Sequence, residues 1–216
     1  MKKIVVIGAT GFTGSAIISE LVSRDHKVLG ISRKEKYSDS ENLSYAPIDV
    51  HQTAKLAEVL KGNDIIISAF NPGRPNPNAY SEYIAGAKSI LEAVRNSGVK
   101  RFIVIGGAGS LYVADGVQMV DTMEKDNEYF QEISAARDFL NIMKEDKELD
   151  WAFFSPAFEM HPGIKTGRTG KYRLGLDTPV VDDNSRSILS VQDLAVVVAD
   201  EVENPRHHQV RFTAGY

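Results

Sequence analysis

The chain has 216 residues, 43% of them hydrophobic and 25% charged, with a net charge of −4. This length suits a single α/β domain over 1–216, and the absence of a basic run argues against nucleic acid as a partner. With no cysteine, disulfides and thiolate metal sites are excluded, and we predict no metal site of any kind. No stretch approaches the ~18 apolar residues of a membrane span, so we expect a cytoplasmic protein, monomer or homodimer, with no membrane partner.

The first 24 residues contain a glycine turn between a strand and a helix. Residues 4–7 are apolar and β-branched, which predicts a strand buried on both faces, and apolar residues at helical spacing run from Ile17 to Val22. A turn of this kind brings backbone N–H groups and the positive end of a helix to a diphosphate. We therefore predict a dinucleotide site made by Gly8, Thr10, Gly11, Phe12, Thr13 and Gly14.

The end of the second predicted strand, 27–32, bears on which dinucleotide binds. An NAD site usually places an acidic residue about 20 residues beyond the glycines, to bond the ribose. This chain has Ser32-Arg33-Lys34 there. Because a guanidinium pairs well with a phosphate, we predict that Arg33 and Lys34 contact the 2′-phosphate of NADP, with NAD as the second choice of cofactor. The alternative is a solvated basic loop.

The middle of the chain continues the alternation of strands and helices. We predict strands at 43–48, 65–70 and 101–105, and helices at 53–60 and 79–96. Ligands bind at the carboxyl ends of strands in open α/β sheets. We therefore assign Ser68, Ala69, Phe70, Gly106 and Gly107 to the cofactor site, where the glycines leave room for the nicotinamide. In the proline-rich loop 71–78, Arg74 is interpreted as an exposed arginine. Tyr80 and Tyr83 fall on a helical core stripe and are predicted to pack.

The last third of the chain predicts a long helix over 122–147, starting near Asp121, and a strand over 150–155 stopped by Pro156. Residues 157–185 are predicted to form a loop and short hairpin on the substrate side of the cleft. Ser190 and Asp193 form a capping box before the last helix, and 211–216 is a final strand. The whole order predicts an α/β, doubly wound, mainly parallel Rossmann sheet with helices on both faces and a small C-terminal substrate lobe.

These motifs resemble the short-chain dehydrogenase/reductase superfamily, and within it the atypical family described as NADH-flavin reductases. The matching segments are Gly-Ala-Thr-Gly at 8–11, Gly-Gly-Ala-Gly-Ser at 106–110, Leu-Asp-Trp at 149–151, Ser-Pro-Ala at 155–157, Arg-Thr-Gly-Lys-Tyr-Arg at 168–173 and Arg-Phe-Thr-Ala-Gly-Tyr at 211–216. The resemblance implies that Asp49, followed by Val50, lies beside the adenine. A helix-start role for Asp49 is compatible with this.

Typical members of the superfamily use a tyrosine with a lysine four residues later. That lysine is missing after each of Tyr80, Tyr83, Tyr112, Tyr129 and Tyr172. The resemblance then implies an NAD(P)H-dependent oxidoreductase that passes hydride to a flavin, quinone or similar planar acceptor, with the flavin a substrate and not a bound group. Stacking surfaces are predicted at Phe70, Gly106, Gly107, Pro156 and Phe158. Ser110 is a candidate to hydrogen-bond the acceptor, and His161 a candidate proton donor, although a lone loop histidine is more often incidental.

Two alternatives remain open. The chain could be a redox sensor that binds NADP without turnover and acts through a protein partner. A sugar-nucleotide epimerase is disfavoured by the short C-terminal region and by the missing tyrosine–lysine pair.

Overall fold

A single eight-stranded sheet forms the centre of the molecule, and the computed structural model describes all of residues 1–216. The strands are β1 (Lys3–Ile7), β2 (Lys27–Ser32), β3 (Leu43–Pro47), β4 (Ile65–Ser68), β5 (Arg101–Ile105), β8 (Asp150–Ser155), β9 (Arg173–Gly175) and β10 (Val210–Gly215). The helices are α1 (Phe12–Ser23), α2 (Thr53–Leu60), α3 (Ala79–Ser97), α4 (Phe130–Glu145) and α5 (Val191–Glu203). The order of the strands in the sheet is β3-β2-β1-β4-β5-β8-β10-β9, and only the β10–β9 pair is antiparallel. The predicted doubly wound, mainly parallel sheet is confirmed.

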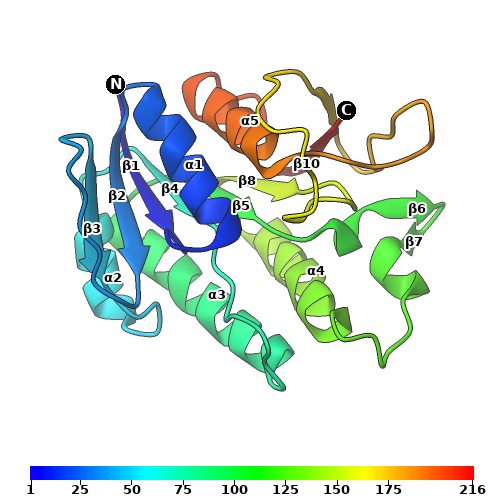
Figure 1. The fold of residues 1–216 in the computed structure, drawn as a ribbon. Helices are drawn as coiled ribbons and strands as arrows, with labels where there is room; N and C mark the ends of the chain where they lie inside the picture. Colours follow the sequence, from blue (N-terminus) through cyan, green and yellow to red (C-terminus); the bar gives the residue numbers. More distant parts are fainter.

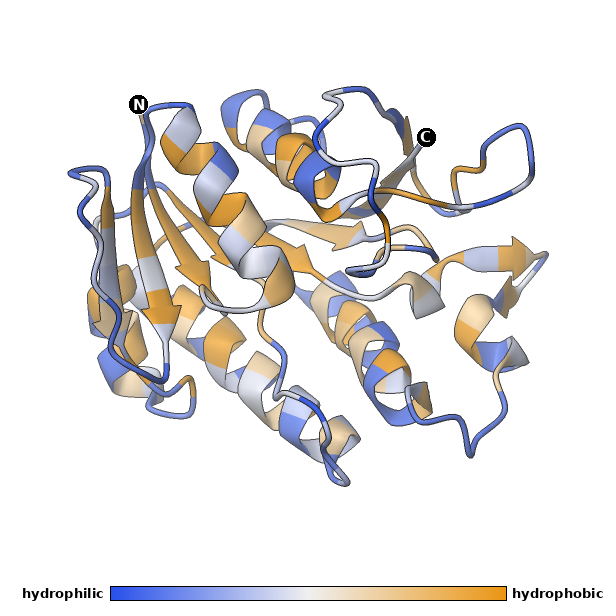
Figure 2. Ribbon diagram, viewed as in Figure 1, coloured by the Kyte–Doolittle hydropathy of each residue, from blue (hydrophilic) through white to orange (hydrophobic).

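Helices cover both faces of the sheet (Figure 1). One layer holds α1 and α5, which pack on each other, and the opposite layer holds α2, α3 and α4. Central strands such as β1 are fully buried from Ile4 to Ile7, because each of their faces meets a helical layer. Figure 2 shows this as hydrophobic strands between helices of mixed hydropathy. None of the helices combines the length and hydropathy that crossing a membrane requires.

The predicted helix over 122–147 is wrong at its start, since α4 begins only at Phe130. Its apparent capping signal belongs to a short 3₁₀ helix, η2 (Met119–Thr122), where the Asp121 carboxylate accepts a hydrogen bond of 2.9 Å from the Gln118 backbone N–H. A small unpredicted hairpin precedes it, formed by β6 (Tyr112–Ala114) and β7 (Val117–Gln118). A capping pattern marks the start of a helix but not its length, and the apolar stripe of α4 follows later.

The hairpin predicted within 157–185 is also wrong. The one strand in that region, β9, pairs antiparallel with β10, where Gly175 faces Thr213. The expected N-cap of α5 is confirmed, because the Ser190 hydroxyl accepts a hydrogen bond of 3.0 Å from the Asp193 N–H. Asp193 does not return this bond to Ser190; its carboxylate accepts hydrogen bonds from the segment that leads to β9.

Candidate active site

A cavity of about 580 Å³ opens at the carboxyl edge of the sheet. It is lined by the glycine turn, by residues at the ends of β2, β4 and β5, by the loop at 71–74, and by the first turns of α3 and α4. A volume of this size lies within the ~300–1,000 Å³ of most small-molecule sites. Because the lining segments come from separate parts of the chain, only the folded sheet brings them together.

The glycine turn is shaped to receive a diphosphate. Gly8 has φ +82°, and a Cβ atom there would overlap the carbonyl oxygen of Ala69. A Cβ at Gly14 would overlap the carbonyl oxygen of Gly8, so α1 approaches β1 only because this residue is glycine. Gly11 is the N-cap of α1 and supplies no side-chain cap, which leaves N–H groups of the first turn available to an anion. The residues present therefore fit a dinucleotide.

The predicted adenosine end of the site lies at the carboxyl ends of β2 and β3. Arg33 is exposed at the rim, and Asp49 and Val50 also line the cavity. The Asp49 carboxylate accepts a hydrogen bond of 2.9 Å from the His51 N–H in the turn before α2, but the N-cap of α2 is Gln52, so Asp49 does not start that helix. Lys34 does not line the cavity; its carbonyl accepts the Ser32 hydroxyl at 2.7 Å.

The opposite end of the cavity has an apolar wall beside the polar residues of the 71–74 loop and Glu132. Of the residues assigned there from sequence, Ala69, Phe70 and Gly106 line it, joined by Ile105 and Met160. Others lie at or near strand ends but outside the lining: Ser68, Gly107, Pro156 and Phe158. The cavity is therefore lined by part of the predicted stacking surface, namely Phe70 and Gly106.

Neither candidate for proton transfer or acceptor binding reaches the cavity. Ser110 is 1% exposed, and its hydroxyl is hydrogen-bonded to the Ser155 hydroxyl at 2.9 Å. His161 is exposed, and its Nδ1 accepts a hydrogen bond of 3.1 Å from the Gly163 N–H. Its neighbour Met160 lines the cavity instead.

Sequence reasoning missed a polar group that ties the 71–74 loop to α4. The two carboxylate oxygens of Glu132 accept hydrogen bonds of 2.5 Å, one from the Asn71 amide and one from Arg74 Nε. The Arg74 guanidinium also lies over the Tyr129 ring, 4.4 Å from its centroid. Arg74 is half exposed, as expected, but it is paired. Because α4 begins at Phe130, Glu132 lies in its first turn and lines the cavity. A helix predicted to begin at 122 would place Glu132 in its middle, so the sequence offered no reason to assign it to the site.

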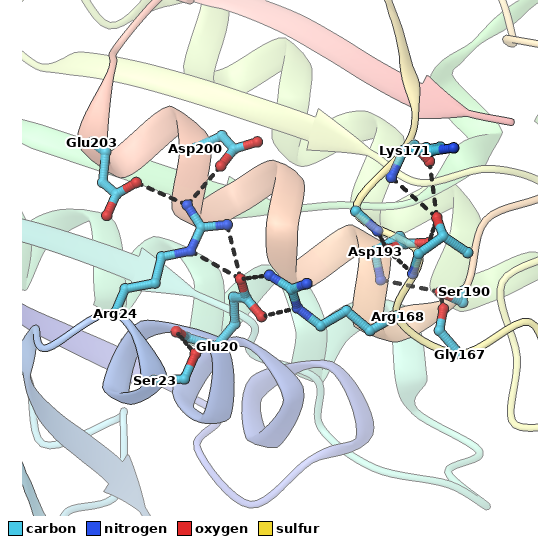
Figure 3. A network of polar contacts seen from close by, with 12 residues as sticks. Glu20, Ser23, Arg24, Gly167, Arg168, Lys171, Ser190, Asp193, Asp200 and Glu203 are labelled. Carbon is cyan, nitrogen blue, oxygen red and sulfur yellow. Dashed lines mark hydrogen bonds and ion pairs between the residues drawn. The ribbon is translucent and has the colours of Figure 1, made fainter.

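The Arg-Thr-Gly-Lys-Tyr-Arg motif fastens the C-terminal lobe to α1 and α5 (Figure 3). Arg168 donates two hydrogen bonds of 2.8 Å to Glu20, and Arg24 donates a third of 2.9 Å. The bonds from Arg168 lower the pKa of Glu20, against the opposing effect of burial. Asp193, fully buried in α5, accepts hydrogen bonds of 2.8 Å from the N–H groups of Thr169 and Gly170. We therefore assign this motif a positioning role.

Replacing Asp193 by alanine is expected to release this segment. The amides of Thr169 and Gly170 would lose their acceptor, and their hydrogen exchange should become about 10-fold faster or more, since each bond to a charged group contributes ~1.5–3 kcal/mol. Amide exchange followed by NMR measures this, with the amides of β1 as an internal control for global stability. Unchanged exchange at both positions would contradict the assignment.

Comparisons with known proteins agree with this geometry. Residues 8–205 match the family described as NAD(P)H-binding. The uncharacterised Bacillus subtilis protein YwnB is 32% identical over 213 residues, which cover 98% of this chain and 97% of YwnB. The crystal structure of a candidate epimerase from Bacteroides thetaiotaomicron has 43% identity and a TM-score of 0.91, covering 100% of this chain and 97% of that one. A candidate NADH-flavin reductase from Streptococcus pneumoniae has 30% identity and a TM-score of 0.86, covering 100% and 99%. The chain belongs to the NAD(P)H-binding family of Rossmann-fold oxidoreductases.

Proposed function

We propose that the protein is an NADPH-dependent reductase that passes hydride to a planar acceptor such as a flavin or a quinone. The observation that carries this proposal is the division of one cavity into two chemically different ends. A backbone cradle and Arg33 lie at one end, and an apolar surface made by Phe70, Ile105 and Met160 lies at the other. The first end suits a phosphorylated dinucleotide, and the second suits a flat ring.

NADPH supplies a hydride when bound, so that NADPH, the acceptor and one proton give NADP⁺ and the two-electron-reduced acceptor. The chain's own contribution is to hold two rings together and keep water from between them. No lysine lines the cavity, so the pair that typical superfamily members use for alcohol chemistry has no counterpart there. A reduced flavin or quinone takes its proton from water, and therefore needs no such pair.

The name of the streptococcal relative supports the reaction class, since it is described as a candidate NADH-flavin reductase. Its name specifies NADH. We nevertheless favour NADPH for this chain, because the residues after β2 are basic and Arg33 forms no ion pair with an acidic group of the protein. The direct test is steady oxidation of NADPH, followed by absorbance, on adding free flavin or a quinone to the purified protein. Tight NADPH binding without turnover across a broad acceptor panel would overturn the proposal.

Replacing Arg33 by alanine is expected to weaken NADPH binding by about 10- to 150-fold, because the variant loses a charge-assisted hydrogen bond to the 2′-phosphate. NADH has no such phosphate, so its affinity should stay nearly constant. Dissociation constants from calorimetry measure both effects.

Lys36→Ala is the matched control. Lys36 follows β2 closely but lies over the Tyr45 ring, 4.9 Å from its centroid, and does not line the cavity. This variant should bind both dinucleotides as the native chain does. Equal losses of NADPH and NADH affinity in Arg33→Ala would mean that Arg33 does not contact the 2′-phosphate.

A further inference from the structure

Tyr83 combines a core position with access to the cavity. It lies on α3 and is 5% exposed, yet it lines the cavity. Its ring packs between Phe70 and Phe139, with centroid distances of 6.1 Å and 6.5 Å. The predicted packing role is therefore correct for the ring.

The Tyr83 hydroxyl has no partner within the protein. It is hydrogen-bonded to no other group. The hydroxyl oxygen is also not fully enclosed by protein atoms, so it keeps a little exposed surface. The small exposed part of the residue therefore includes the hydroxyl, and the residue is one of those that line the cavity. The other buried polar side chain in the lining, Ser32, donates its hydrogen to the Lys34 carbonyl at 2.7 Å. Because buried polar groups are nearly always paired, the Tyr83 hydroxyl marks a place for a polar atom of a ligand.

The chemistry of this hydroxyl is that of a donor. Burial, together with the negative charge of Glu132, raises the pKa of Tyr83 well above its usual value, so the phenol stays neutral around pH 7. Glu132 forms no hydrogen bond with it; the Glu132 carboxylate accepts from Asn71 and Arg74. The hydroxyl hydrogen is therefore free for an acceptor atom on a bound molecule.

The order of the strands separates Tyr83 from the end of the cavity where the 2′-phosphate is predicted. β2, which leads to Arg33, and β4, which leads to Phe70, lie on opposite sides of β1. Tyr83 packs on Phe70, on the β4 side, and the charge of Glu132 on α4 acts on it. It therefore lies by the apolar wall of the cavity, where the acceptor is expected.

We infer that the Tyr83 hydroxyl donates a hydrogen bond to a carbonyl oxygen of the acceptor, which selects carbonyl-bearing planar rings of the quinone or flavin type. This inference rests on the proposed function. Tyr83 is then a substrate-binding residue that keeps its proton, and the proton of the reduced acceptor comes from water.

Tyr83→Phe tests this, because it keeps the ring and removes only the hydroxyl. At saturating NADPH we expect kcat/KM for menadione, a quinone, to fall about 5- to 10-fold, the effect of one neutral hydrogen bond. Activity with methylene blue, a planar acceptor without a carbonyl group, should stay constant, as should the dissociation constant of NADPH. Tyr80→Phe is the control from the same helix: Tyr80 donates to Asp138 at 2.9 Å and does not line the cavity. It should match the native chain in every assay.

Binding of menadione to the NADP-loaded protein, measured by equilibrium dialysis, gives a second readout that needs no turnover. The affinity should fall by a similar factor in Tyr83→Phe. If the native chain binds NADPH but turns over no acceptor, the proposed function fails, and menadione binding still decides the inference. Unchanged menadione binding and kinetics, an equal loss with methylene blue, or a loss confined to NADPH affinity would each overturn it.

Discussion

Gly14→Val is expected to abolish measurable NADPH binding and to destabilise the fold by about 3 kcal/mol, at the upper end of overpacking costs. The new Cβ would overlap the carbonyl oxygen of Gly8, which is backbone and has no rotamer to change. Either α1 moves away from β1 or the turn at Gly8 opens. Both changes displace the N–H groups that receive the diphosphate, so stability and affinity should fall together. Thermal unfolding and calorimetry with NADPH measure the two losses.

Helix propensity predicts the opposite sign, which makes the test sharp. Gly14 lies within α1, and replacing a helical glycine by alanine normally gains ~1 kcal/mol. Gly14→Ala adds only the Cβ and should nevertheless destabilise, because the overlap is with the Cβ itself. Ser19→Val, on the exposed face of the same helix, is the control for β-branching and should change stability by less than ~0.5 kcal/mol. A Gly14→Ala variant as stable as the native chain would refute the close approach of α1 to β1.

The sheet could be predicted from sequence because its strands carry their own evidence. Residues 4–7 and 65–67 are continuous apolar runs, and only a strand with a helical layer on each face buries such a run completely. The strand at 173–175 has no such signal. β9 has an exposed leucine and lies at the edge of the sheet, so its pairing with β10 depends on the rest of the fold. Local pattern therefore predicted the centre of the sheet and failed at its last edge strand.

The same distinction applies to the cavity. The glycine turn is a local motif, and Gly8, Gly11 and Phe12 line the cavity. Tyr83 and Glu132 are contributed by two different helices, and the cavity exists only where those helices begin. A helical stripe shows that Tyr83 faces the sheet. It does not show that Tyr83 also lines the cavity, which depends on where β4 and β5 end.

Glu201→Gln is expected to cost about 3–5 kcal/mol, the usual effect of breaking a buried ion pair from one side. Glu201 is 4% exposed; one of its oxygens accepts from Arg101 at 2.5 Å, and the other contacts His207 Nδ1 at 2.7 Å. Arg101 begins β5 and is itself 7% exposed, so the neutral variant leaves its positive charge buried without this partner. For a chain of this size each kcal/mol lowers the melting temperature by ~2–4 °C, so a drop of roughly 6–20 °C is expected by calorimetry.

The pH dependence of stability follows from the same group. Burial opposes ionisation of Glu201, but hydrogen bonds from His207, from its side chain and its backbone, outweigh burial and lower the pKa of the carboxyl. A carboxyl whose pKa is lower in the folded state contributes stability above its unfolded pKa of ~4.3, and loses it as the pH falls through the folded value. The difference in stability between the native chain and Glu201→Gln should therefore be constant near pH 7 and shrink below about pH 4.

Glu203→Gln, two residues further along α5, separates this effect from the loss of any carboxylate. Glu203 is 35% exposed at its side chain and pairs with Arg24 and with the buried His26. Because its carboxylate keeps contact with water, its replacement should cost less than ~1 kcal/mol. If both variants melted within 2 °C of the native chain, the free energy of unfolding would have changed by less than ~1 kcal/mol. Glu201 would then not hold β5 to the start of β10. A large loss of stability in Glu201→Gln alone would show that the buried Glu201–Arg101 pair holds this end of the sheet together. That end includes β10, the strand with which β9 pairs.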